Sequence, residues 1–219
     1  MEDIKKSHFD REIINKWAIA ENNQLIDSIS EKFDLKQYNS NGFIGYIYID
    51  HMVGISLQIH SLCRIEPSEK PLIVANMQDI GHILILRYGM FDDVSLLSQE
   101  EVDDFSLPAE PDWLVHYEPF KYSDIRERVD LDQFRAPGFF DDVSVILISK
   151  NNEYTPEVVW VRLDEMMKGG MVFQGQLLNE PNADFGVHIG EIIPVFYVEN
   201  QDERYLISGN GTTDLNQKN

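Results

Sequence analysis

The residues that could do chemistry in this chain are scattered. There are six histidines and one cysteine, and His60 with Cys63 comes closest to a metal-ligand pair. Structural zinc sites use four ligands, usually as two such pairs, and no second pair follows here. Residues three apart in a strand also face opposite sides of it. We therefore expect no metal at this position and interpret Cys63 as a buried, unreactive thiol.

His188 and Glu191 form a second spacing of interest. A histidine and a glutamate three residues apart can bind a metal from one face of a helix. The surrounding glycines and β-branched residues favour a strand or turn instead. The aspartate pairs at 92–93 and 141–142 lack the ligand spacing of a calcium-binding loop. The sequence thus predicts no metal site and no cofactor.

Known catalytic signatures are absent from the sequence. The chain has no Gly-x-Ser-x-Gly turn, no GxxxxGK[ST] or GxGxxG phosphate loop and no HExxH zinc motif. Asp and Glu number 38, so carboxylate pairs occur by abundance alone and none can be named as acid and base. We nominate no catalytic residue, and the sequence favours a protein that is not an enzyme.

The charge balance indicates the kind of partner. The 219 residues include 38 acidic and 18 basic ones, for a net charge of -20. Such a surface repels nucleic-acid phosphates and attracts basic proteins. The charged N-terminus has no apolar leader, and no apolar run is long enough to cross a bilayer. We therefore expect a protein that binds neither nucleic acid nor membrane. Its single cysteine fits a reducing compartment, so we expect it to be cytoplasmic.

The first half of the chain should contain a helical lead and an antiparallel meander. Two trios of apolar residues at four-residue spacing predict the lead: Phe9, Ile13 and Trp17, then Leu25, Ile29 and Phe33. Alternation within 43–62 predicts a hairpin. The nearly continuous apolar runs 71–77 and 82–88 predict strands buried on both faces, at the centre of a sheet. The acidic stretch 98–118 should be a surface loop that ends in a short strand around Trp113.

The second half should be a compact antiparallel sheet. Apolar runs within 156–198 are separated by Gly, Asn and Pro, and a short helix within 121–133 should precede them. The segments that begin at Gly89 (GMFDDVSL) and Gly138 (GFFDDVSVI) resemble each other. They suggest two related units, with chance similarity as the alternative.

The expected fold class is α+β, an N-terminal helical segment followed by mostly antiparallel sheets. We expect an N-terminal domain at 1–120, a C-terminal domain at 121–208 and a flexible tail at 209–219. The tail is polar and rich in Gly and Asn.

Three motifs follow one another between about residues 134 and 205. They are Glu157-Val-Val-Trp160-Val-Arg, then Phe173-x-Gly175-x-Leu177-x-Asn179-x-Pro181, then Gly190-Glu191 before the last apolar run. This segment resembles a bacterial family of uncharacterised proteins typified by YegJ. The resemblance covers about a third of the chain. It implies a small α+β domain, a bacterial source and sometimes a setting near toxin and immunity genes. The Asp-Trp pair that tends to end the family's pattern is missing, because 200–207 is NQDERYLI.

Four residues of this segment are candidates for binding: Trp160, Asn179, His188 and Glu191. Most of the motif also has a structural explanation. Gly175 within a strand indicates a bulge or a close backbone approach, and Asn179 can hydrogen-bond its own backbone at a corner that Pro181 makes rigid. We therefore favour a structural role over ligand binding for this set of residues, since turn chemistry accounts for every member but Trp160.

The expected function is a non-catalytic, acidic protein-binding module, conceivably of the immunity type that neutralises a basic partner. The alternative is a small-molecule-binding or hydrolytic enzyme with a cleft near Trp160 and His188, and a partly apolar pocket with convergent polar groups would favour it. A third class, a structural or oligomerising element, predicts a large apolar patch at a symmetric interface.

Overall fold

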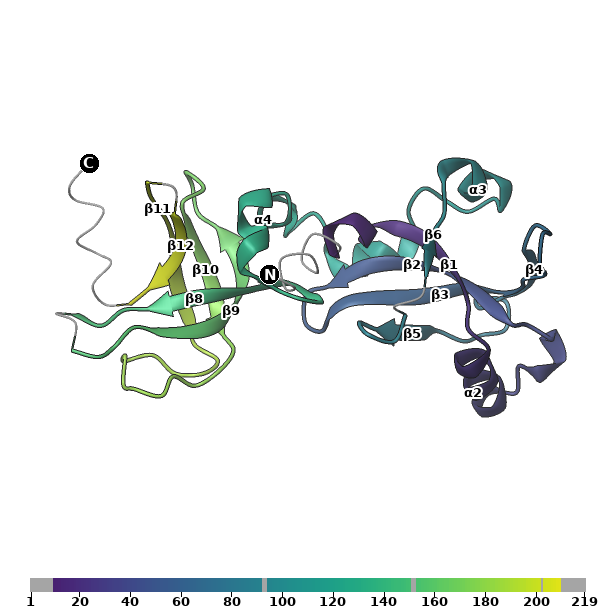
Figure 1. Ribbon diagram of the computed structural model, residues 1–219, viewed down its shortest axis with the longest axis horizontal. Helices are drawn as coiled ribbons and strands as arrows, with labels where there is room; N and C mark the ends of the chain where they lie inside the picture. Colours follow the sequence, from purple (N-terminus) through teal and green to yellow (C-terminus); the bar gives the residue numbers. More distant parts are fainter. Residues whose placement is uncertain (1–9, 92–93, 151–152, 202, 210–219) are drawn as a thin grey trace. The chain divides into compact units, whose positions relative to one another are not determined.

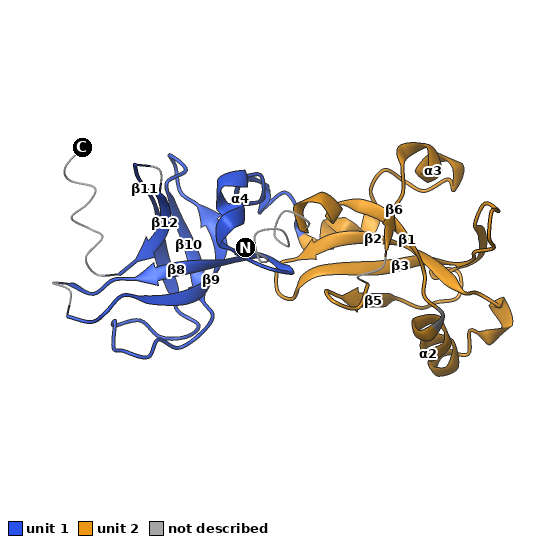
Figure 2. Cartoon of the chain, in the orientation of Figure 1, with its two compact units in different colours: residues 1–8, 118–219 blue, residues 9–117 orange. Residues whose placement is uncertain are grey.

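The chain forms two compact units in a computed structural model. The model describes residues 10–91, 94–150, 153–201 and 203–209 (Figure 1). Unit 2 is residues 9–117, and unit 1 contains the chain from residue 118 onward (Figure 2). The division falls close to the boundary expected after residue 120. Of the expected tail, only Gly209 lies within the described residues.

Unit 2 is built on a six-stranded antiparallel sheet. Its strands are β1 (Lys16–Glu21), β2 (Gly42–Asp50), β3 (Gly54–Arg64), β4 (Leu72–Asn76), β5 (Leu84–Arg87) and β6 (Ser95–Leu96). The order is β4-β3-β2-β1-β6, and β5 pairs with β3 beside that path. A short 3-10 helix, η1 (Lys36–Tyr38), precedes β2. The expected hairpin of β2 and β3 is confirmed, and both strands are mostly buried.

The predicted helical lead is only half right. Residues 10–13 are helical, but Trp17 lies in β1, opposite Tyr46 of β2. Trp17 is 3% exposed, and its indole N–H donates to the Pro108 backbone oxygen at 2.7 Å. These long-range contacts override the local four-residue spacing. The second trio does lie in a helix, α2 (Asn23–Phe33), which Asn22 caps by accepting a hydrogen bond from the Leu25 N–H at 2.9 Å.

Strands β4 and β5 exist, but the expectation that they are central and buried on both faces is wrong. Both pair with the same edge of β3, β4 with residues 61–64 and β5 with residues 56–59. Neither has a second strand neighbour among the described residues. Leu84 and Leu86 are buried, whereas Leu72 is 58% exposed. One covered face is therefore enough to account for these apolar runs.

The acidic stretch after β6 contains two short helical segments joined by a loop at 105–111, where a loop that ends in a strand was expected. Helix α3 (Gln99–Asp104) begins with a capping box, in which Ser98 and Glu101 bond each other's backbone N–H groups. Trp113 lies in a 3-10 helix, η2 (Asp112–Tyr117), where a short strand was expected. The carboxylates at the start of α3 favour its N-terminus, so local charge supports this helix.

Unit 1 is a small barrel preceded by two short helical segments. These are α4 (Ser123–Arg126) and η3 (Val129–Phe134), and the strands are β7 (Arg135–Ala136), β8 (Phe139–Leu147), β9 (Glu157–Met166), β10 (Val172–Leu177), β11 (Ile192–Asn200) and β12 (Glu203–Ser208). Strands β8 to β12 form an antiparallel meander. The last strand pairs in parallel with the first, Ile207 opposite Ile146, and this closes five strands into a barrel. The predicted compact sheet is confirmed, and the class of the protein is α+β.

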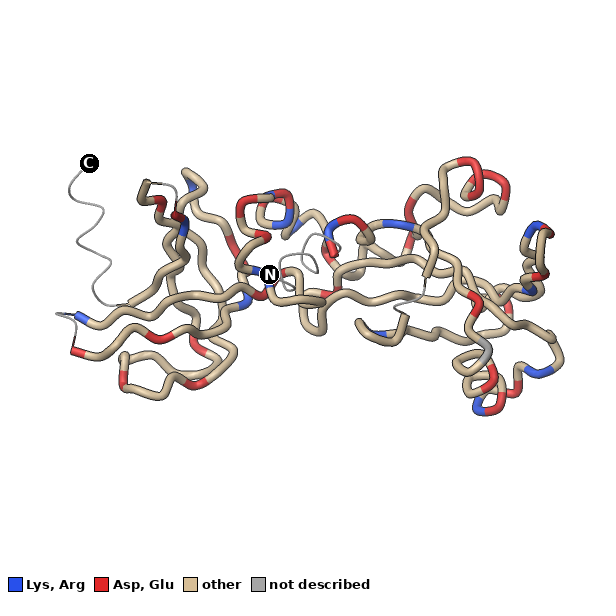
Figure 3. The backbone as a smooth tube through the Cα atoms, in the orientation of Figure 1, with Lys and Arg blue, Asp and Glu red and all other residues tan. Residues whose placement is uncertain are grey.

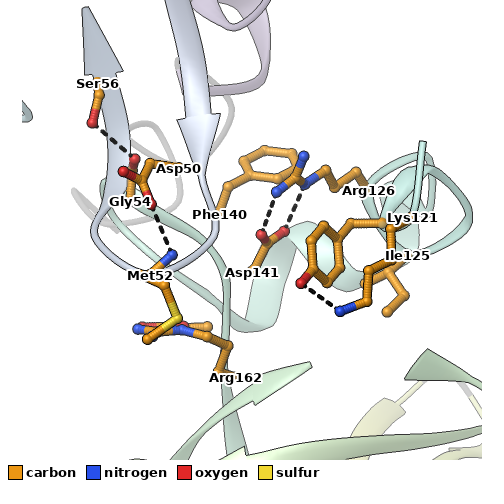
Figure 4. Close-up of polar contacts among 12 residues, drawn as sticks. Asp50, Met52, Gly54, Ser56, Lys121, Ile125, Arg126, Phe140, Asp141 and Arg162 are labelled. Carbon is orange, nitrogen blue, oxygen red and sulfur yellow. Dashed lines mark hydrogen bonds and ion pairs between the residues drawn. The ribbon is translucent and has the colours of Figure 1, made fainter. Parts of the chain in front are cut away.

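Arginine–aspartate pairs tie the helical segments and strands of unit 1 together. Arg126 donates two hydrogen bonds to Asp141, at 2.9 and 2.6 Å (Figure 4). Arg162 of β9 holds Asp142 of β8 in the same way, at 2.7 and 3.1 Å. The aspartate pair at 141–142, in the second of the two similar segments, thus binds arginines within unit 1. The first pair, at 92–93, lies outside the described residues, and the strand orders of the two units differ.

Candidate functional site

Trp160 and Asn179 meet at the corner where β10 ends. The Trp160 backbone N–H donates to Asn179 Oδ1 at 2.7 Å, and the Leu178 N–H donates to the Trp160 oxygen at 2.9 Å. Asn179 therefore extends the pairing of β9 and β10 beyond the last residue of β10. Its Nδ2 also donates to the Glu180 backbone oxygen at 3.5 Å, so Asn179 shapes the corner both by a bond across the strands and by a local backbone bond of the kind that the sequence suggested.

His188 and Glu191 lie in the loop between β10 and β11, where both hold the backbone in place. His188 Nδ1 lies 2.8 Å from Glu180 Oε1, and the Ile189 N–H donates to the other oxygen of Glu180 at 2.8 Å. The His188 N–H donates to Glu191 Oε2 at 3.1 Å. The hydrogen bond with Glu180 raises the pKa of His188, and the same bond lowers the pKa of the Glu180 carboxyl. Within the described ranges, no group of three or more His, Cys, Asp or Glu could hold a metal ion.

Exposed apolar side chains occur on β9, at the start of β11 and in the loop before β11. Val158 and Trp160 of β9 are 62% and 40% exposed, and they alternate with buried Val159 and Val161. The cross-strand register places Gln176 of β10 between Arg162 and Ile192, so β9 and β11 share this face. We call Val158, Trp160, Ile189 and Ile192 the barrel face. Ile189 and Ile192 are 58% and 57% exposed.

Carboxylates border the barrel face. Glu157 precedes Val158 and bonds the backbone and side-chain N–H groups of Asn182, at 2.8 and 2.7 Å. Glu180 and Glu191 flank Ile189, and both are exposed. Acidic residues also occur along the chain of both units (Figure 3). The arrangement can receive an apolar group and a positive charge together.

A second candidate site, a cavity of about 1000 Å³, lies in unit 2. Its floor follows from one row of cross-strand neighbours, Trp17–Tyr46–Gln58–Ile85, which runs over β1, β2, β3 and β5. The first two residues of the row are buried aromatics, whereas Gln58 and Ile85 are only partly buried and line the cavity.

The segment 108–117 covers the aromatic end of this row. Trp17 bonds Pro108, and the Tyr117 hydroxyl lies 3.0 Å from that of Tyr48. Trp113 packs edge-on against Tyr48, with ring centroids 5.0 Å apart. The cavity is the space between this segment, Gln58 and Ile85 at the other end of the row, and the connection between β4 and β5.

Polar side chains converge on the cavity: Gln58, His60, Gln78, His82, Asp112 and His116. His60 Nδ1 lies 2.6 Å from Ser61 Oγ, which donates to Asn76 Oδ1 at 2.8 Å. Burial lowers the pKa of His60, and Asp79 opposes this effect. The sequence placed His60 on the polar face of its strand, but it contained no signal for His82 or His116. Cys63 is fully buried as expected, and burial raises the pKa of its thiol to about 12.

Comparison with known proteins adds no relative. No family model matches the chain, no curated protein matches it, and no solved structure matches it. The YegJ-like resemblance therefore stays a prediction. Within the described part of the chain, no helix is long and apolar enough to cross a membrane.

Proposed function

We propose that this chain is a non-catalytic binding protein whose barrel face binds a basic, partly apolar segment of another protein. The supporting observation is the barrel face itself, four exposed apolar side chains bordered by carboxylates. Contiguous apolar patches with polar rims are typical of protein-interaction sites. An acidic rim favours a basic partner, because complementary charge speeds encounter and rejects acidic competitors.

The positions of the arginines in unit 1 support an acidic face. Arg126, Arg128, Arg135 and Arg162 each pair with an aspartate within the unit. Their charges are therefore already compensated by aspartates, including that of Arg162, which lies in one cross-strand row with Gln176 and Ile192. The glutamates of the rim accept hydrogen bonds from histidine and backbone N–H groups, and Glu180 and Glu191 are exposed residues, so their carboxylates can also accept from a partner's lysine or arginine.

The YegJ-like resemblance favours one form of this function, an immunity-type protein that neutralises a basic toxin. The acidic composition and the exposed barrel face are both compatible with that role. In the alternative, a hydrolytic site near Trp160 and His188, these two residues would take part in catalysis. The contacts that support the binding function instead assign them to the corner and the loop that display the barrel face.

The three tryptophans provide a direct test. In the ¹⁵N-labelled full chain, Trp17, Trp113 and Trp160 each give one indole N–H signal, which single Trp→Phe variants assign. A synthetic peptide of alternating lysine and leucine should shift the Trp160 signal, and the same peptide with glutamate for lysine should not. Binding should weaken between about 0.1 M and about 1 M salt, because the Debye length falls from about 10 Å to about 3 Å.

A matched pair of variants locates the site. Trp160→Ala should weaken binding of the basic peptide about tenfold or more, as expected for an aromatic residue at the centre of an interface. Phe120→Ala removes another aromatic side chain of unit 1, 82% exposed, and should leave binding unchanged. Equal losses in both variants, or equal binding of the acidic peptide, would exclude the barrel face as the binding site.

A further inference from the structure

We propose that the cavity of unit 2 binds a small organic cation, an amine with an aromatic or apolar body. This goes beyond the proposed function, because unit 2 contributes no residue to the barrel face. The two sites can be tested separately, since each contains its own tryptophan, Trp113 in the cavity and Trp160 on the barrel face.

The shape and the walls suit a small molecule. A volume of about 1000 Å³ lies at the upper end of the range for small-molecule sites, about 300–1,000 Å³. The walls are mainly apolar: Ile59, Met77, Ile83, Ile85, Pro108 and Pro111. The polar groups come from three separate segments that meet at the cavity. Apolar walls with a few convergent polar groups are typical of ligand-binding pockets.

The charge of the lining selects against anions. Among the described residues that line the cavity there is no lysine or arginine, and Asp112 supplies one carboxylate. Over residues 9–117 as a whole, acidic residues also outnumber basic ones. A bound phosphate or carboxylate would lose its hydration without gaining a fixed positive partner, which is unfavourable. An ammonium group meets a carboxylate instead.

The hydrogen bonds of His60 leave an acceptor for the ligand. The Ser61 hydroxyl has one proton, and it donates that proton to Asn76. It must therefore accept the hydrogen bond from His60 Nδ1, which fixes the proton of the neutral ring on Nδ1. The other ring nitrogen, Nε2, then holds a lone pair. An N–H of an ammonium group can donate to that lone pair, as it can to Asp112 or to the side-chain oxygen of Gln58.

The aromatic wall completes the site. Trp113 and Tyr117 line the cavity, and both are held by other aromatic rings. Cations bind favourably over the faces of such rings. Because Trp113 already packs against Tyr46 and Tyr48, little side-chain freedom is lost when a ligand binds. The site is therefore organised before the ligand arrives.

Three compounds of nearly equal size and different charge test the proposal: phenethylamine, 2-phenylethanol and phenylacetate. Each is titrated into the ¹⁵N-labelled full chain at about pH 7.5, where the amine is cationic and the acid is anionic. Phenethylamine should shift the Trp113 indole signal and should bind at least about tenfold tighter than phenylacetate. The alcohol should fall between them. The Trp160 signal reports the barrel face separately and should shift less than the Trp113 signal at every amine concentration, because Trp160 is exposed on an open face whereas Trp113 lines a cavity.

Two charge-removing variants test the role of Asp112. Asp112→Asn should weaken phenethylamine binding about three- to tenfold and should leave the alcohol unchanged. Glu100→Gln makes the same charge change on an exposed residue of α3 that does not line the cavity, and it should leave both compounds unchanged. The Trp17 indole signal should be unaltered in both variants, because its hydrogen bond to Pro108 reports the intact fold of the segment.

Three results would overturn the proposal. Phenylacetate binding as tightly as phenethylamine would show that the cavity does not select a cation. A shift of Trp160 as large as that of Trp113 would show non-specific binding. No shift of Trp113 by the amine up to about 10 mM, where affinity is weaker than about -3 kcal/mol, would show that the cavity does not take this class of ligand.

Discussion

Replacing Arg135 with methionine should show how far unit 1 depends on a single buried guanidinium. The Arg135 side chain is 2% exposed, and its Nε lies 3.0 Å from Asp132 Oδ1, whose side chain is also 2% exposed. The same group donates to the backbone oxygens of Ile125, at 2.8 Å, and Phe140. Arg135 therefore connects α4 and η3 to the beginning of β8.

The expected cost follows from what the substitution leaves unpaired. Removing one partner of a buried ion pair costs about 3–5 kcal/mol, because the remaining charge stays buried. Arg135→Met also deprives the Ile125 and Phe140 oxygens of this donor. Asp132→Asn also leaves a buried charge, that of Arg135, but it keeps a side-chain oxygen as acceptor and both bonds to the backbone oxygens, so it should cost less than Arg135→Met. Arg204→Met is the matched control, because Arg204 pairs with Glu199 in solvent, and it should cost less than about 1 kcal/mol.

Urea unfolding followed by the Trp160 indole signal measures these costs. Trp160 is the only tryptophan in the sequence from residue 118 onward, so its signal reports unit 1 alone. With a slope of about 1–3 kcal/mol per molar urea, Arg135→Met should lower the midpoint by about 2 M. A loss for Asp132→Asn as large as that for Arg135→Met would refute the reasoning, since the bonds to the two backbone oxygens would then contribute nothing.

Two further predictions concern the motif segment. Gly175→Ala should lower the free energy of unfolding of unit 1 by about 1–3 kcal/mol, because a Cβ there would lie 2.4 Å from the Arg162 oxygen; an unchanged urea midpoint would contradict this. The His188–Glu180 pair should stabilise its loop most between pH 4.5 and 6.5. Because the pKa of His188 is raised, its contribution to stability is complete below pH 6.5 and is lost as pH rises through the pKa of the folded state. Because the pKa of Glu180 is lowered, its contribution is complete above pH 4.5 and is lost as pH falls through the pKa of the folded state. An NMR titration should place the pKa of His188 above 6.5, and Glu180→Gln should bring it back toward 6.5; no change in this variant would exclude the pair as the cause.

Local patterns predicted the strands well where neighbours in sequence are also neighbours in the sheet. The β2–β3 hairpin and the meander of unit 1 follow from alternation and from turn residues, both of which are short-range signals. Gly175 is a clear example. A glycine inside a strand predicted a bulge, and the register of β10 against β9 shifts between Gln174 and Gly175.

The same patterns failed where a distant partner decides the structure. Trp17 and Phe33 have the same four-residue spacing to their apolar neighbours, yet Trp17 lies in a strand and Phe33 in a helix. The difference is the pairing of β1 with β2 and the bond from Trp17 to Pro108, 91 residues away. The histidines of the cavity come from a strand, the connection between β4 and β5, and a 3-10 helix. No local pattern could bring them together.

The cavity itself has a physical cause in the sheet beneath it. Segment 108–117 is anchored to the aromatic end of the row by the Trp17–Pro108 and Tyr48–Tyr117 bonds. Moving it toward Gln58 and His60 would break these bonds. It would also bury the Gln58 amide and the His60 imidazole beside apolar members of the segment such as Pro108 and Pro111, and a buried polar group without a partner costs about 1–3 kcal/mol. The space beside Gln58 and His60 therefore stays open, so a ligand that fills it must itself donate hydrogen bonds.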